Sequence, residues 1–427
     1  MGHHSIHLEK MRMNMSGFGK RFLTVLEYLW ALAVILNGNS VYYASADVEL
    51  HLLELSVILT YCVTVGHFIV YGFHPTRQNV MITLALLLYC TIYLSVMQTS
   101  MNVGVYVMLF VLGAPALYML FSEMNRQGRL LKLMHRFVDW LCILAIISLF
   151  FWIFGVVLNL FPPNGYMEVN WGAFSKIRGY YGIHYAFQYD TTFMPDGVLF
   201  RNSGIFAEAP MFNLWLCIAL GLELFATAKP KRWRVVVLSV TILTTLSVTG
   251  ILFLILCIGL SAWIHYKTLS RAKKCLLLLG AAVAIPVVAT VLLESISLKA
   301  ETDSFDMRLS DYIGGVKLWM DYPLFGAGFG NLKVFIGYVY SPNGTVGFSN
   351  SIAAVLGTGG VWMALLYYLS HIGMLIPTIT GSRKLSCFGI CMMFLFCTTI
   401  FYARYIGVVI IMLGLAIMLG PKDKWDI

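Results

Sequence analysis

Charged residues are scarce in this sequence. Asp, Glu, Lys and Arg make up only 11% of the 427 residues, whereas hydrophobic residues make up 59%. The mean hydropathy is +0.80. A soluble domain carries roughly a quarter charged residues. The shortage excludes an ordinary soluble protein and indicates a chain that lies largely within a lipid bilayer.

Cysteine is absent from the two longest polar segments of the chain, residues 161–208 and 294–349. The nine cysteines lie inside apolar runs, which excludes a disulfide framework outside the membrane. Cys387 and Cys391 stand four residues apart, but small buried side chains explain this spacing better than a metal site.

The long apolar runs are continuous and lack the alternation of barrel strands, so they indicate helices. The sequence predicts an all-α, polytopic membrane protein with one transmembrane domain over residues 1–427 and about twelve spanning helices. The first run lacks a cleavage site and is expected to stay as a helix. The apolar run 235–266 is too long for one helix, and Ser247-Val-Thr-Gly250 predicts a break in it. The predicted spans are 22–43, 50–72, 79–98, 102–121, 137–160, 209–228, 235–248, 250–266, 275–293, 350–370, 386–402 and 405–420.

Positive charge orients this arrangement. Most of the 29 Lys and Arg residues fall in alternate connections, which become cytoplasmic when the N-terminus is placed inside. Both termini are then cytoplasmic. The net charge of +9 therefore reflects the orientation of the chain in the membrane and its contact with anionic lipid. We expect no nucleic-acid partner.

Two long connections are predicted on the outer face, residues 161–208 and 294–349. Long loops are where function usually lies. The first loop is rich in aromatic residues, which suit sugar rings or a membrane interface, and it ends in Arg201-Asn-Ser-Gly-Ile-Phe-Ala-Glu-Ala-Pro210. His184 in this loop is expected to be a structural hydrogen-bonding residue. Arginines in both loops suggest capture of a phosphorylated lipid headgroup.

The second loop carries Arg308 between Asp306 and Asp311, followed by Pro323-Leu-Phe-Gly-Ala-Gly-Phe-Gly330. No strand precedes these glycines and no Lys-Ser/Thr follows them, which argues against a nucleotide-binding loop. We expect the glycines to allow close packing of the loop's backbone. Few ionisable residues lie within the spans, which argues against an ion-coupled carrier.

The order of these motifs resembles the O-antigen polymerase and ligase superfamily of bacterial envelope glycosyltransferases. The resemblance rests on the segment 201–210, Leu246-Ser-Val-Thr-Gly-Ile-Leu252, Arg308 with Trp319, the segment 323–330, and Asn350-Ser-Ile-Ala-Ala-Val-Leu-Gly-Thr-Gly-Gly360. It implies a bacterial cytoplasmic (inner) membrane and chemistry on its outer face.

The resemblance also implies the substrates: an undecaprenyl-pyrophosphate-linked oligosaccharide donor and an acceptor, with no metal or other cofactor. A chain-length regulator and a flippase are implied as further partners. Arg201 and Arg308 match the family's functional arginines, and Glu208 is the first candidate for the general base, with Asp306 and Asp311 behind it. Arg178 and Asn350 are further substrate-binding candidates.

Departures from the family pattern separate its branches. Ligases place a histidine before the Asn-Ser pair and a second glycine downstream, where this chain has Ser349 and Met363. Some polymerases have a glycine eleven residues after the arginine, where this chain has Phe212 and Trp319. The sequence therefore predicts a polysaccharide polymerase. The alternatives are the ligase, a peptidoglycan-type polymerase, and a flippase or exporter of lipid-linked oligosaccharide.

Overall fold

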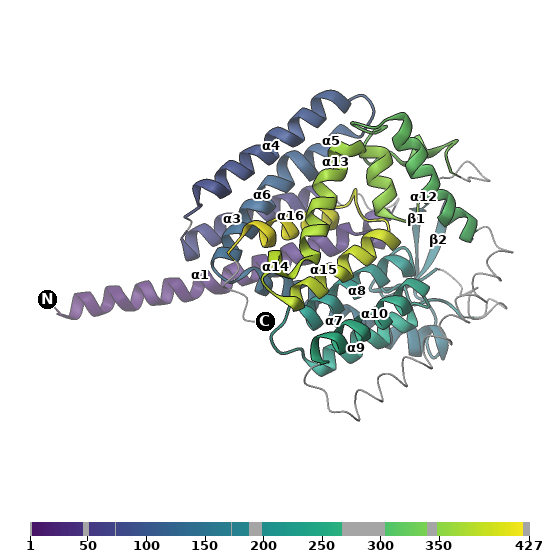
Figure 1. Cartoon of the computed structure of the whole chain (residues 1–427). Helices are drawn as coiled ribbons and strands as arrows, with labels where there is room; N and C mark the ends of the chain where they lie inside the picture. Colours follow the sequence, from purple (N-terminus) through teal and green to yellow (C-terminus); the bar gives the residue numbers. More distant parts are fainter. Residues whose placement is uncertain are drawn as a thin grey trace.

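The computed structural model describes residues 2–45, 51–72, 74–171, 173–187, 199–266, 304–339 and 348–421. A bundle of helices forms most of it (Figure 1). The helices in the first half of the chain are α1 (Gly2–Asn37), α2 (Val41–Ala44), α3 (Leu52–Tyr71), α4 (Arg77–Met97), α5 (Val103–Tyr106), the π-helix η1 (Val107–Gly113), α6 (Ala114–Arg126), α7 (Leu130–Phe151) and the π-helix η2 (Trp152–Val157).

The helices of the second half follow a sheet segment. They are α8 (Ala209–Phe225), α9 (Arg232–Thr244), α10 (Val248–His265), α12 (Ser304–Asp321), the short 3₁₀ helix η3 (Leu332–Phe335), α13 (Ser351–Leu375), α14 (Pro377–Thr380), α15 (Arg383–Thr398) and α16 (Tyr405–Leu419). The predicted span 275–293 lies outside the described residues.

Local chemistry sets many of these boundaries. The side chains of Thr76, Asn102 and Asn350 accept hydrogen bonds from backbone amides in the first turns of α4, α5 and α13. Proline occupies the first turn of α8, where its missing N–H costs nothing. The predicted break in the run 235–266 is confirmed, because α9 ends at Thr244 and α10 begins at Val248, with Leu246 at φ 49° between them.

Among the described residues, six helical segments are long and apolar enough to cross a membrane: Leu52–Tyr71, Arg77–Met97, Val103–Arg126, Leu130–Val157, Val248–His265 and Ser351–Leu375. Helices α8 and α16 are apolar but shorter. On α4, the exposed side chains of Leu84, Leu88, Ile92 and Val96 recur at four-residue spacing and form an apolar stripe. Such a stripe would be unfavourable in water and suits contact with lipid chains, as expected of a polytopic membrane protein.

The core of the bundle is built from large aromatic side chains. Trp30 on α1 lies against Phe137 on α7, with ring centroids 5.2 Å apart, and Phe137 stacks on Trp215 of α8 at 6.0 Å. Helix α16 is buried along nearly its whole length and packs against α6 and α13. It is therefore a central helix, which explains why its sequence is apolar on all sides.

A three-stranded antiparallel sheet interrupts the helices, in contrast to the predicted all-α fold. Strands β1 (Gly165–Trp171), β2 (Ala173–Tyr180) and β3 (His184–Ala186) pair in the order β1-β2-β3. Tyr181 and Gly182, both at positive φ, turn the chain from β2 into β3. The apolar side of the sheet packs on α2 through Val41, Val169 and Ile177. Much of the aromatic first loop is thus a folded sheet.

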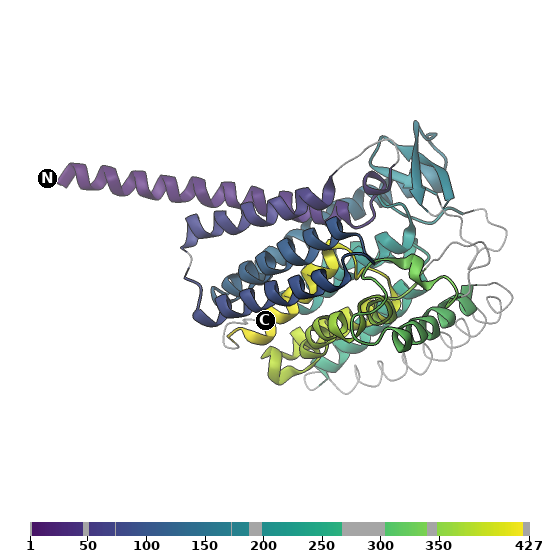
Figure 2. The ribbon, with the colours of Figure 1, turned by 90° about the horizontal axis from the view of Figure 1, so that it is seen from above.

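The sheet and α12 lie at the same end of the bundle, away from the N-terminus (Figure 1). Figure 2, seen from above, shows them on opposite sides of that end. The described parts of the two long predicted loops therefore lie at one end of the molecule. We refer to it below as the loop end.

Candidate functional site

The first candidate cluster surrounds Arg201, where the chain returns from the sheet to the helices. The Nε–H of Arg201 donates to the carbonyl oxygen of Thr245 at 2.9 Å, which fixes the guanidinium at the C-terminal end of α9. A cation at this helix end is favoured by the helix dipole. The neighbouring Asn202 donates from Nδ2 to the Thr244 hydroxyl at 2.9 Å, so two successive side chains hold the segment on the α9–α10 turn.

Glu208 lies seven residues further on, at the N-cap of α8. Its side chain is half-buried and makes no capping bond, although its carbonyl oxygen accepts from the amides of Met211 and Phe212. Arg178 projects from β2, where its guanidinium carbon lies 5.2 Å from the centroid of the Phe200 ring. Arg178 therefore lies beside Phe200, the residue that precedes Arg201.

The second cluster joins α12 to the start of α13. Asp311 is buried, and its Oδ2 accepts a hydrogen bond from the backbone amide of Ser349 at 2.8 Å. Burial raises the pKa of Asp311 from 3.8 to about 6, although the Ser349 bonds and the charge of Arg308 oppose the rise. Arg308 lies one helical turn before Asp311 and is exposed. Within the described ranges, no carboxylate forms an ion pair with Arg308.

Asn350 follows Ser349 and caps α13, since its Oδ1 accepts from the amide of Ala353 at 2.9 Å. Its Nδ2 is buried and has no hydrogen-bond partner in the described structure. Asp306 lies in α12, but its side chain falls outside the described part. The structure therefore brings together Arg308, Asp311 and Asn350, while Arg201, Glu208 and Arg178 form a separate group.

The glycines after α12 have the role expected of them. Ala327 and Gly328 donate backbone hydrogen bonds to the carbonyl oxygens of Gly357 and Thr358 in α13, at 3.1 and 3.0 Å. In return, the amides of Val361 and Trp362 donate to Pro323 and Leu324. The backbone of α13 is non-helical at Gly360, so the segment 323–328 satisfies groups that this kink releases. The segment holds α12 against α13 by backbone contact.

The prediction for His184 is wrong. Both ring nitrogens lack a hydrogen-bond partner in the described structure, and the ring stacks on Phe151 with centroids 6.1 Å apart. Burial lowers the pKa of His184 to about 3, so the ring is neutral. It serves as a packing residue of the sheet, because the chain around it offers rings and no polar partner.

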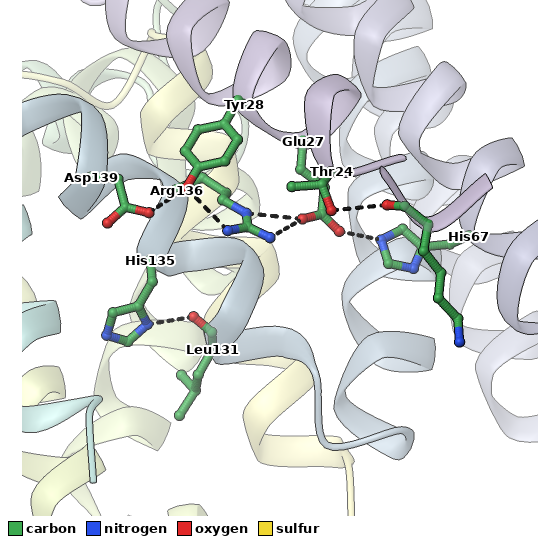
Figure 3. A network of polar contacts seen from close by, with 9 residues as sticks. Thr24, Glu27, Tyr28, His67, Leu131, His135, Arg136 and Asp139 are labelled. Carbon is green, nitrogen blue, oxygen red and sulfur yellow. Dashed lines mark hydrogen bonds and ion pairs between the residues drawn. The ribbon is translucent and has the colours of Figure 1, made fainter. Parts of the chain in front are cut away.

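A different polar network, which sequence reasoning did not assemble, joins α1, α3 and α7 (Figure 3). Arg136 and Asp139 lie near the start of α7, and the sheet follows the other end of that helix. The Glu27 carboxylate on α1 accepts from Arg136 on α7 at 2.8 Å and lies 3.1 Å from Nε2 of His67 on α3. Arg136 also donates to the Tyr28 hydroxyl at 3.2 Å, and Tyr28 donates to Asp139 at 2.6 Å. The only sequence signal was the position of these acids near span ends.

The network continues into α8 and α9. Arg234 donates to Asp139 at 2.5 Å and to Glu223 at 3.4 Å, and Glu223 also accepts from the backbone amide of Lys231. Each arginine of this network has a carboxylate partner. Buried charges that are paired in this way fix the packing of the helices. Among the described carboxylates, none pairs with Arg308 at the loop end, so its planar guanidinium remains available to an anion.

Comparison with known proteins agrees with the motif order. Residues 233–368 match the sequence model of the family described as O-antigen ligase. No curated protein matches the chain. The matched region runs from α9 into α13 and contains Arg308, Asp311 and Asn350. The match confirms the resemblance to the O-antigen ligase and polymerase superfamily, whose members are glycosyltransferase-like enzymes of envelope polysaccharide synthesis.

Proposed function

We propose that the protein polymerises polyprenyl-diphosphate-linked oligosaccharide repeat units at the outer face of the bacterial cytoplasmic membrane. The observation that carries the proposal is the cluster of Arg308 and Asp311 inside the matched region. It combines a cation that pairs with none of the described carboxylates and a buried acid whose pKa is raised to about 6. This pair can bind a phosphate and accept a proton, as transfer of a glycan from a diphosphate requires.

The reaction breaks the bond between the anomeric carbon of the donor glycan and its diphosphate. An acceptor hydroxyl on a second repeat unit forms the new glycosidic bond, loses its proton to a carboxylate, and polyprenyl diphosphate leaves with the bonding electron pair. Negative charge grows on the leaving oxygen. The guanidinium groups of Arg201 and Arg308 would bind this diphosphate, because their planar forks match phosphate oxygens.

Two carboxylates are candidates for the proton acceptor. Glu208 is half-buried beside the Arg201 segment. Asp311 has the stronger physical support, because a base works best when its pKa lies near the operating pH and burial moves this carboxyl towards neutrality. Its backbone bond from Ser349 also fixes the carboxylate in position.

A polymerase is favoured over a ligase by the residue at position 349. Ser349 stands where ligases place a histidine, and its backbone amide binds Asp311. The Asp311 carboxylate thus binds the backbone at position 349, where a ligase has a histidine. The paired charges at the other end of the bundle also disfavour a flippase or exporter, whose pathway would need membrane-embedded groups available to its cargo.

The test is complementation of a strain in which the gene is deleted, with surface polysaccharide read as a ladder on a gel. The variants are Arg201→Ala, Arg308→Ala and, as a matched control, Lys317→Ala, which removes an exposed cation from the same helix as Arg308. Loss of one transition-state donor lowers a rate about 10²–10³-fold, so both arginine variants should give only single repeats.

Other outcomes would identify the alternatives. Long lipid-linked polymer that accumulates without surface glycan indicates a ligase. A full ladder from both arginine variants, at normal protein levels, contradicts the arginine mechanism and favours a transporter.

A further inference from the structure

Arg404 is a further arginine at the loop end, in addition to Arg178, Arg201 and Arg308, and it lies outside both clusters. It lies at the N-cap of α16, in the turn that joins α15 to α16, and its side chain is half-buried. Its Nη1 donates to the hydroxyl of Tyr43, and its guanidinium carbon lies 4.7 Å from the centroid of the Tyr43 ring. These contacts restrain the guanidinium without neutralising its charge.

No carboxylate in the described ranges forms an ion pair with Arg404, and its Nε and Nη2 donate to no described protein acceptor. In contrast, Arg126, Arg136 and Arg234 at the other end each pair with Glu or Asp. A half-buried, restrained guanidinium with unused donors is well suited to an anion, and a phosphate accepts two parallel N–H bonds from such a fork.

The turn that carries Arg404 contacts the second loop. Ser351, next to Asn350, donates from its hydroxyl to the carbonyl oxygen of Thr399 at 2.7 Å and accepts from the amide of Phe401 at 2.8 Å. A β carbon on Gly330 would lie 3.5 Å from the β carbon of Ala403. The turn that carries Arg404 is thus hydrogen-bonded to the start of α13, next to the Ser349 amide that binds Asp311.

The short helix that carries Tyr43, the partner of Arg404, contacts the first loop. Tyr43 lies in α2, whose first amide, that of Val41, donates to the carbonyl oxygen of Ile205 at 2.9 Å. The amide of Ala207, next to Glu208, donates to the carbonyl oxygen of Asn39 at 3.2 Å. A short series of direct contacts therefore joins Arg404 to the Arg201–Glu208 segment on one side and to Asp311 on the other.

We propose that Arg404 binds the diphosphate of the second lipid-linked substrate, the acceptor repeat unit. This inference rests on the proposed polymerase function, because in that reaction both substrates carry a polyprenyl diphosphate while Arg201 and Arg308 serve the one that leaves. The acceptor keeps its diphosphate throughout, so a cation that holds it contributes binding and no chemistry. A phospholipid headgroup offers the same phosphate chemistry, and the experiment below separates the two sources.

The experiment uses purified protein in phosphatidylcholine nanodiscs. The donor is an undecaprenyl-diphosphate-linked repeat unit that lacks its accepting hydroxyl. It is combined either with the intact lipid-linked repeat or with the same repeat as a phosphate-free alkyl glycoside. Product formation gives KM and kcat for each acceptor. The variants are Arg404→Ala, Arg404→Lys, which keeps the charge but loses the fork, and the control Lys317→Ala.

We expect Arg404→Ala to raise KM for the lipid-linked acceptor about 10- to 100-fold, the usual effect of losing hydrogen bonds to a charged group. Its KM for the alkyl glycoside and for the donor should stay unchanged, and Arg404→Lys should fall between Arg404→Ala and wild type. Added phosphatidylglycerol should leave the wild-type KM for the acceptor unaltered.

An unchanged KM in Arg404→Ala would overturn the inference, as would an equal loss with both acceptors, which indicates a structural role. A wild-type KM that rises with phosphatidylglycerol would identify a headgroup site instead. Wild-type protein without activity on either acceptor would contradict the proposed function itself, and so the two failures are distinguishable.

Discussion

Gly360 in the kink of α13 lies directly against Gly326 in the segment that follows α12. A β carbon on Gly360 would overlap with the amide nitrogen of Gly326 and lie 2.5 Å from the carbonyl oxygen of Leu324. Both glycines also have positive φ, at 59° and 72°. The close approach of α12 to α13, and with it the position of Arg308 and Asp311, depends on the absence of side chains at this point.

We expect Gly360→Ala to destabilise the protein and to abolish activity, because the variant must both adopt a strained backbone and push the two segments apart. Strain of this kind costs on the order of 1–3 kcal/mol before the steric overlap is added. Gly337→Ala is the matched control, since Gly337 has φ 90° but no atom within 4 Å of its β position. Thermal denaturation in detergent should show a larger loss for Gly360→Ala, and equal losses would contradict the packing argument.

The buried acid Asp311 predicts a pH-dependent stability. Its pKa is raised from 3.8 to about 6 in the folded protein, so folding favours the protonated form. The associated stability is complete below pH 3.8 and is lost as the pH rises through about 6. Asp311→Asn keeps an acceptor for the Ser349 amide without the charge. The variant should therefore melt above wild type at pH 7.5 and gain no such advantage at pH 4. A constant difference would show that burial does not raise this pKa.

The same carboxyl predicts the pH profile of the reaction. If Asp311 accepts the proton of the acceptor hydroxyl, the wild-type kcat should fall as the pH drops through about 6. Asp311→Asn should lower kcat about 10²–10⁴-fold and remove this acid limb, whereas Glu208→Gln should keep it. If Glu208→Gln removes the acid limb and Asp311→Asn keeps it, the base is Glu208.

The Glu27–Arg136 pair predicts a large structural effect far from the candidate site. Replacing Glu27 by Gln leaves Arg136 without its carboxylate, and loss of one partner of a buried pair costs about 3–5 kcal/mol. Glu54→Gln is the control, because the Glu54 side chain is 44% exposed and contacts only the exposed ring of His51 in its ion pair, so its removal should cost less than about 0.5 kcal/mol. Thermal denaturation of Glu27→Gln, Arg136→Gln and the double variant should give a double loss smaller than the sum of the single losses. Additive losses would mean that the two residues do not interact.

Several local features of the fold could be predicted because they depend on local signals. The break near Ser247, the proline at the start of α8 and the glycines that pack the loop after α12 are all legible in the sequence. The sheet was not predicted, because its β2–β3 turn uses Tyr181 at positive φ, a residue that seldom adopts that conformation.

Contacts between distant segments could not be predicted. Asp311 meets a backbone amide at Ser349, and Arg404 meets Tyr43 from 361 positions away. No sequence pattern points to either contact. Every residue except proline has a backbone amide, and tyrosine is common in this chain, so neither partner can be singled out. The candidate residues Arg201 and Arg308 came from motif order, while the surroundings that favour an anion came only from packing.

Arg136 meets the carboxylate of Glu27 only after the helices have assembled, since the two residues are 109 positions apart on α7 and α1. During synthesis α1 is made well before α7, so the carboxylate of Glu27 is present before the guanidinium of Arg136. An unpaired arginine helps to orient the chain at that stage, whereas an acid contributes little. The charge of Arg136 can thus serve twice, first in orienting the chain and then in the ion pair, and neutralising Glu27 should leave the orientation of the chain intact while weakening its final assembly.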